Sequence, residues 1–151
     1  MANPNLEFQG QERFAAPPAR VFALLTDLNA LAGQIPDATA TDVVDQHTLR
    51  ATVRPGFAFL RGTLKLVITI DDVVDQRSAL MRIDAQGIGQ AMQIESRFQI
   101  EPDAEGTRLD WEGRVVQLKG LVATVSSALV RGAAEQVIRS AWSGLHEQLD
   151  R

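Results

Sequence analysis

Apolar and polar residues alternate along most of the middle of the chain, and this alternation predicts a series of β-strands. The clearest example is the segment 92–101, in which Met92, Ile94 and Phe98 share one face and charged or amide side chains occupy the other. Segments rich in glycine, proline and aspartate separate the alternating runs, as expected of turns. The pattern predicts strands over residues 6–14, 41–44, 49–53, 63–70, 79–85, 92–101 and 108–115.

A helical period replaces the alternation at two places. Pro18 suits the first turn of a helix because its missing N–H costs nothing there, and Val21 and Phe22 begin an apolar face. A second short helix is predicted through Leu31. After Gly120 the apolar residues recur every three or four positions, which predicts one long C-terminal helix. Its expected apolar stripe comprises Val122, Val125, Leu129, Ala133, Val137, Ala141, Leu145 and Leu149.

This order of elements predicts an α+β fold in a single domain over residues 1–151. Strands joined by short turns pair as antiparallel neighbours, and each predicted strand is apolar on one face only. The long C-terminal helix is the element that is able to cover that face. We therefore expect a curved antiparallel sheet of about six or seven strands wrapped around that helix, with two short helices after the first strand.

Composition narrows the class of protein. Hydrophobic residues make up 45% of the 151 residues, which is enough apolar material for one core, and the net charge of −4 argues against a nucleic-acid partner. The absence of cysteine excludes disulfides and fits a reducing, cytoplasmic compartment. Residues 1–5 lack the features of a secretory signal, and the longest apolar runs are far below the about 20 residues that span a bilayer.

Residues suited to acid–base or metal chemistry are few. His47 and His146 are the two histidines, and we predict that both lie on the surface. Asp71 and Asp72 fall in a predicted turn, and Asp27 is expected to cap the second short helix. Tyrosine is absent. The sequence therefore predicts no catalytic set, no metal site and no cofactor.

The apolar side chains of the expected inner face are the remaining candidates for function. Parity alone leaves two interpretations open, because the same residues either fill an ordinary core or line a cavity for an apolar small molecule. The candidate ligand-binding residues are Phe57, Phe59, Met81, Met92, Ile94, Phe98 and Trp111 from the sheet region, with Leu129 and Val137 from the helix.

Short motifs along nearly the whole chain resemble a known family. They are Phe8-x-Gly10, Ala16-Pro17, Val21-Phe22-x-x-Leu25, Asp27, Leu31, Ile35-Pro36, Gly62, Thr107-x-Leu109-x-Trp111 and Gly120-Leu121-Val122-Ala123. The element order resembles the START-like, helix-grip (SRPBCC) superfamily that includes the Bet v 1 allergens, and within it the carbon monoxide dehydrogenase CoxG family. The chain departs from that family at Asp37, where glycine is usual, and at Leu28, where proline is common.

The resemblance implies a cavity for a lipid or a quinone-like molecule and no set of catalytic residues. It also implies a molybdenum hydroxylase as partner and peripheral contact with the inner face of the cytoplasmic membrane. We therefore expect a non-enzymatic binding protein. Two alternatives stay open, namely an enzyme of the polyketide cyclase or hydratase kind and an adaptor without a ligand. The segment Pro55–Arg61 is either the contact segment of such an adaptor or a lid over the pocket.

Overall fold

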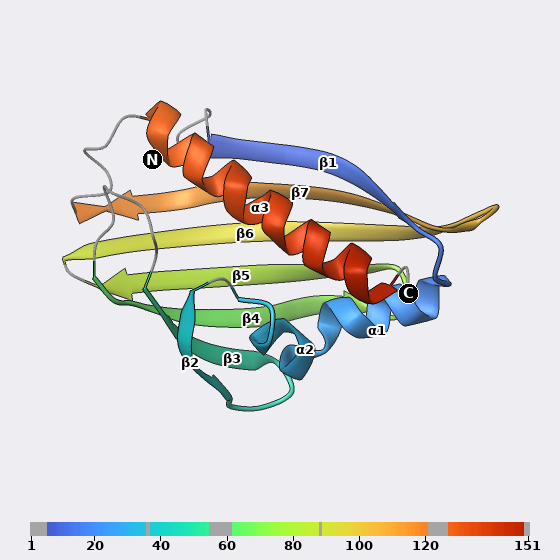
Figure 1. The fold of residues 1–151 in the computed structure, drawn as a ribbon, viewed down its shortest axis with the longest axis horizontal. Helices are drawn as coiled ribbons and strands as arrows, with labels where there is room; N and C mark the ends of the chain where they lie inside the picture. Colours follow the sequence, from blue (N-terminus) through green and yellow to red (C-terminus); the bar gives the residue numbers. More distant parts are fainter. Residues whose placement is uncertain (1–5, 36, 55–61, 88, 121–126, 150–151) are drawn as a thin grey trace.

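The computed structural model describes residues 6–35, 37–54, 62–87, 89–120 and 127–149. Within these segments one seven-stranded antiparallel sheet curves beneath a long helix, as predicted (Figure 1). The strands lie in the order β1-β7-β6-β5-β4-β3-β2. The elements are β1 (Glu7–Phe14), α1 (Pro18–Thr26), α2 (Leu28–Ala32), β2 (Ala38–Val43), β3 (Thr48–Val53), β4 (Leu64–Val74), β5 (Ser78–Gly87), β6 (Gln90–Asp103), β7 (Gly106–Lys119) and α3 (Ser127–Leu149).

The two short helices begin where the sequence predicts them. Pro18 occupies the first turn of α1. Asp27 separates α1 from α2, and its carboxylate accepts hydrogen bonds from the backbone N–H groups of Asn29 at 2.9 Å and Ala30 at 3.3 Å. These bonds satisfy donors that the first turn of a helix leaves free. The predicted capping role of Asp27 is confirmed.

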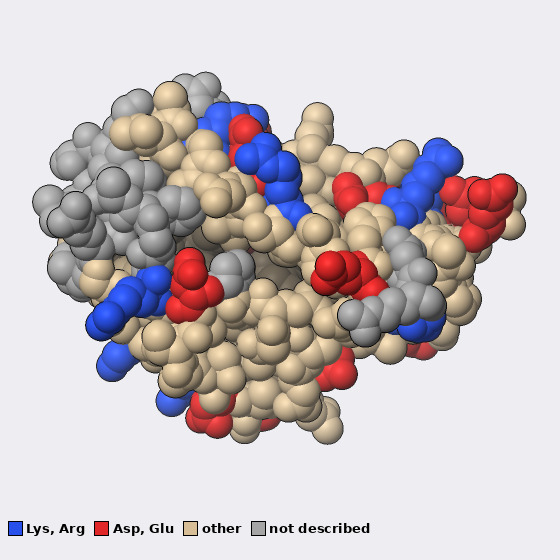
Figure 2. Space-filling view, in the orientation of Figure 1, with Lys and Arg blue, Asp and Glu red and all other residues tan. Residues whose placement is uncertain are grey.

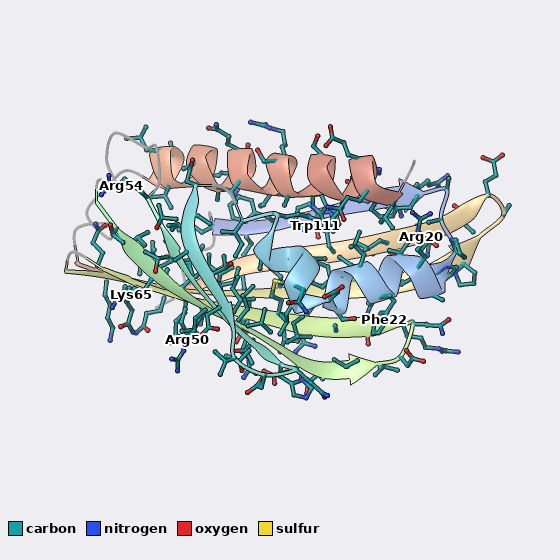
Figure 3. All side chains as sticks on the ribbon, turned by 60° about the horizontal axis from the view of Figure 1, so that its bottom comes forward. Arg20, Phe22, Arg50, Arg54, Lys65 and Trp111 are labelled. Atoms are coloured by element: carbon teal, nitrogen blue, oxygen red, sulfur yellow. The ribbon has the colours of Figure 1, made fainter. Side chains whose placement is uncertain are left out.

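A β-bulge bends the sheet near one end of β7. Gln93 pairs with Gln117 whereas Ile94 pairs with Val115, so that Val116 is an extra residue on β7. A bulge of this kind bends its strand and strengthens the local twist. It also keeps the apolar residues before and after it on the same face, which faces α3. The curvature of the sheet follows, and Figure 3 shows it from the side.

The predicted connection at Asp71 and Asp72 is wrong. β4 continues through both residues to Val74, and its register with β5 shifts between Asp71 and Val74. Asp72 takes a left-handed backbone conformation (φ 50°), which aspartate tolerates better than most residues. The strand therefore passes through a polar stretch that, taken alone, is typical of a turn.

The apolar core is divided into separate clusters around the sheet. One joins α1 and the C-terminal half of α3 to β1, β6 and β7, and a second lies between α2 and strands β3 to β5. A third lies under the first turns of α3, and a small fourth lies between β3 and β4. Compact domains usually contain one contiguous core. The division indicates that the middle of the inner face is not filled.

Gly10 provides a test of how the inner face is packed. A Cβ atom on Gly10 would lie 2.7 Å from Cζ2 of Trp111, whose indole covers this position of β1. We expect Gly10→Ala to lower the free energy of unfolding by about 1–3 kcal/mol, as overpacking does. Gly132→Ala is the matched control, because a Cβ there meets nothing within 4 Å. Urea unfolding should show that it raises stability by about 0.5–1 kcal/mol. Equal effects of the two changes would contradict the packing of Trp111 on Gly10.

Candidate ligand-binding site

The smallest side chains of the inner face lie at its centre. The strand register aligns Phe8 with Gly113, Gly113 with Ser96, and Ser96 with Met81 across four neighbouring strands. Bulky residues thus flank a glycine and a serine at positions where a filled core usually carries leucine, isoleucine or valine. A Cβ on Gly113 would lie 3.2 Å from the Ser96 hydroxyl oxygen, so the two residues are close neighbours. They leave unfilled volume beneath α3.

The predicted strand residues surround this centre. Met81, Met92, Ile94, Phe98 and Trp111 all face the helices by register and by their apolar contacts. Each of the five is only partly buried, although four of them lie on the central strands β5 and β6. Central strands of a filled core would bury such side chains completely. Figure 2 shows the surface hollowed between α3 and the segment that carries α2 and β2.

Aromatic rings close one end of the hollow. The Trp142 ring of α3 lies 5.7 Å from the ring of Trp111, 6.1 Å from that of Phe98 and 6.5 Å from that of Phe14, centroid to centroid. Such distances are favourable for tilted and edge-to-face contacts. Trp111 lies beneath α3 on the inner side of the sheet (Figure 3). This aromatic group is a rigid end wall for the hollow.

On one flank, α3 is fastened to β1 by polar contacts. His146 Nε2 lies 2.9 Å from Glu12 Oε1, and the imidazole stacks on the Phe14 ring at 4.4 Å. Near the other end of the helix, Arg131 donates a hydrogen bond to the Glu7 carbonyl oxygen at 3.2 Å and covers the ring of the next residue of β1. His146 is therefore not the surface histidine that the sequence predicted. Glu12 gave no signal, because a single charged residue on an edge strand is ordinary.

The opposite flank of α3 faces α2. Gly144 lies beside Gln34, whose side-chain oxygen would be 3.6 Å from a Cβ at that glycine. Val137 lies two helical turns earlier on the same face as Gly144 and is 41% exposed, so it borders the opening of the hollow. The expected register is wrong for Leu129, which is 56% exposed, because the structure buries Val130 instead. Phe57 and Phe59, with the rest of the segment Pro55–Arg61, lie outside the described residues.

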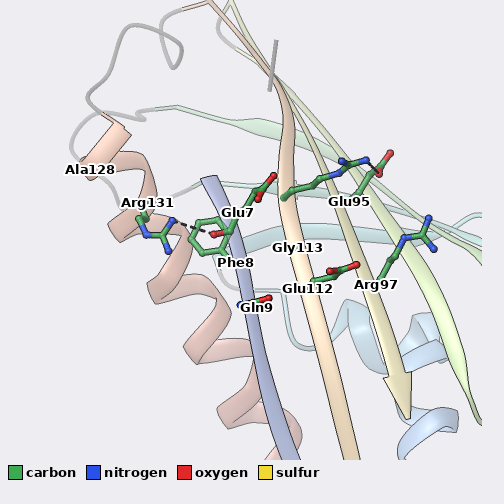
Figure 4. A pocket seen from close by; sticks show the side chains of 10 residues that line it. Glu7, Phe8, Gln9, Glu95, Arg97, Glu112, Gly113, Ala128 and Arg131 are labelled. Carbon is green, nitrogen blue, oxygen red and sulfur yellow. Dashed lines mark hydrogen bonds and ion pairs between the residues drawn. The ribbon is translucent and has the colours of Figure 1, made fainter. Parts of the chain in front are cut away.

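The outer face of the sheet carries paired charges. Arg114 contacts Glu95 at 3.2 Å, and Arg82 lies 3.8 Å from Asp71. A shallow depression of about 980 Å³ on this side is lined mainly by outward-facing residues of β1, β6 and β7, together with Ala128 and Arg131 of α3 (Figure 4). Its arginines and glutamates balance in number, and it lies apart from the small central residues of the inner face. We therefore place the candidate site in the hollow.

The described residues offer little other chemistry. No three His, Asp or Glu side chains in the described segments are grouped as metal ligands. Glu12 is the one ionisable residue of the described strands that the register places on the inner face, and it is engaged by His146. Among the helices of the described part, none has the length and hydropathy needed to cross a bilayer.

Solved structures share this fold at low sequence identity. A conserved protein from Geobacillus kaustophilus matches with a TM-score of 0.86 at 17% identity over 95% of each chain. A protein from Chromobacterium violaceum matches with a TM-score of 0.71 at 11% identity over 97% of this chain and 99% of that chain. A START superfamily protein from Mycobacterium smegmatis matches with a TM-score of 0.70 at 14% identity, covering 95% of this chain and 97% of that chain. The fold is START-like, as the sequence predicted.

The family is established by the sequence itself. The family model of CoxG, the carbon monoxide dehydrogenase G-subunit, matches residues 10–150. The chain belongs to the carbon monoxide dehydrogenase CoxG family, so the departures at Leu28 and Asp37 do not remove it from that family. No curated protein matches the chain.

The pair formed by His146 and Glu12 is testable by a double-mutant cycle. We expect His146→Gln, Glu12→Gln and the double variant to reveal a coupling of about 0.5–1 kcal/mol in urea unfolding, because the pair is partly shielded from water. His47→Gln, at an exposed turn, is the control and should leave stability unchanged. A coupling indistinguishable from zero would show that the contact does not fasten α3 to β1.

Proposed function

We propose that the chain binds an apolar small molecule, lipid-like or quinone-like, in the hollow between the sheet and α3 and does not convert it chemically. The observation that carries this proposal is the pairing of Gly113 and Ser96 beneath α3, surrounded by apolar side chains that stay partly exposed. Burial of a ligand there would remove those side chains from water, which is favourable by about 25 cal/mol per Å² of apolar area. The fold and the family are consistent with such a role.

The proposal extends to the cellular role implied by the family. We propose that the cytoplasmic protein serves a molybdenum hydroxylase of the carbon monoxide dehydrogenase type, at the inner face of the membrane where quinone is found. The family match supports this assignment. The binding site and the partner are separate statements, because a ligand in the hollow does not require that particular enzyme.

A catalytic role is less well supported. A cyclase or hydratase needs a positioned acid or base beside its substrate. On the inner face Glu12 is held by His146 in the seam between β1 and α3, next to Phe14, and not at the centre of the hollow. The adaptor alternative depends on Pro55–Arg61, outside the described residues, and stays a prediction.

A substitution at Ser96 distinguishes a hollow from a filled core. Ser96→Leu adds bulk where the structure has space, so we expect unchanged or raised stability and about tenfold weaker binding of the neutral fluorophore N-phenyl-1-naphthylamine. In a filled core the same change would cost about 1–3 kcal/mol of stability. Gln99→Leu, on the outer face of the same strand, is the control and should not alter fluorophore binding. Destabilisation by Ser96→Leu without an effect on binding would refute the proposed cavity.

The ligand itself is accessible to direct measurement. We expect organic extraction of protein purified without detergent, followed by mass spectrometry, to yield an apolar molecule in near-equimolar amount. The Ser96→Leu protein should yield less of it, because its hollow is smaller. If the extract contains no such molecule and titration with lipids, quinones and the fluorophore shows no binding, the proposed function is wrong.

A further inference from the structure

The two flanks of α3 are held very differently. The flank beside β1 has directional contacts at both ends of the helix, through Arg131 and His146. The described contact across the other flank is that of Gln34 with Gly144, where no side chain projects from the helix. We propose that the contact between Gln34 and Gly144 is the gate of the hollow, through which molecules pass between α3 and α2. This inference rests on the proposed function, because a gate requires a cavity that is occupied and emptied.

Separation on the β1 flank is costly. It would unpair Glu12 from His146 and remove the imidazole from the Phe14 ring. It would also uncover the ring of Phe8, over which the Arg131 guanidinium lies at 4.8 Å from the centroid. Loss of such contacts leaves partly buried polar groups without partners and exposes aromatic surface. α3 is therefore fixed along β1.

Separation on the α2 flank costs much less. Gln34 touches a glycine there, so opening breaks van der Waals contacts and no ion pair of the described residues. The surface is already hollowed at this flank, beside α2 and β2 (Figure 2). Val137, on the same face of α3 as Gly144, is exposed at this opening. An apolar residue at the rim lowers the cost of passage for an apolar molecule.

The backbone around Gln34 also allows movement. Leu28 at the start of α2 is 4% exposed and anchors the helix, whereas Leu31 and Ile35 towards its end are only partly buried. Gly33 ends α2, and Asp37 has a left-handed conformation (φ 60°) that is costly for most residues other than glycine. The end of α2 that carries Gln34 is thus the less firmly packed end, and it moves more easily than its beginning.

Thiol accessibility tests the gate without any ligand. The chain has no cysteine, so Ser96→Cys introduces a single thiol in the hollow. In this background we expect Gln34→Ala to raise the rate of alkylation by N-phenylmaleimide about tenfold, and Gly144→Leu to lower it, because leucine would fill the contact with Gln34. His146→Gln is the matched control: it lies two residues from Gly144 on the other flank and should change the rate less than twofold. Urea unfolding of each variant excludes alkylation through global unfolding.

Exchange of N-phenyl-1-naphthylamine provides the second measurement. The same variants should change its association and dissociation rates in parallel, with little change in affinity, since a gate alters the barrier and not the bound state. Unchanged alkylation in Gln34→Ala, or an equal increase in His146→Gln, would overturn the gate. If the fluorophore binds to none of the proteins while alkylation follows the expected order, the gate stands and the proposed ligand class is wrong.

Discussion

The structure depends on a mismatch in width between the sheet and the helix that covers it. Seven strands spaced about 4.8 Å apart span about 30 Å, whereas a helix with its side chains is about 10 Å wide. α1 and α2 cover further parts of the inner face, and their clusters meet the sheet away from its centre. A strip of apolar surface remains between the helices. Large side chains would fill it in an ordinary core, but Gly113 and Ser96 lie at its centre.

The space persists because its borders are well packed. Trp111 lies against Gly10 on β1 and against Trp142 on α3, so sheet and helix are held apart by a rigid ring rather than by flexible chains. Leu28 anchors α2 on the far side of the hollow. Removal of a buried side chain usually lets neighbouring groups relax into the gap only in part. A gap between such firmly packed borders has no side chain that is able to collapse into it.

Periodicity predicts the fold well and the site incompletely. Alternation depends only on neighbouring residues, so it placed Met92, Ile94 and Phe98 on the correct face. It does not reveal the amount of space in front of that face, because volume depends on strands far apart in the sequence. Ser96 breaks the apolar pattern by one residue, and that was the available signal of a hollow. The helix register failed at Leu129 because glycine and alanine make the stripe broad, and only tertiary contacts select Val130.

The location of the charges explains which properties of a ligand the hollow is able to select. The outer face pairs arginines with carboxylates across neighbouring strands, and the seam between β1 and α3 holds Glu12 and His146 together. The described strands leave the centre of the inner face to apolar and small residues. A ligand there gains free energy from desolvation and dispersion, which depend on its area and shape. The length and width of an apolar molecule therefore decide how well it fits, and the aromatic wall at Trp111 and Trp142 limits how far it reaches.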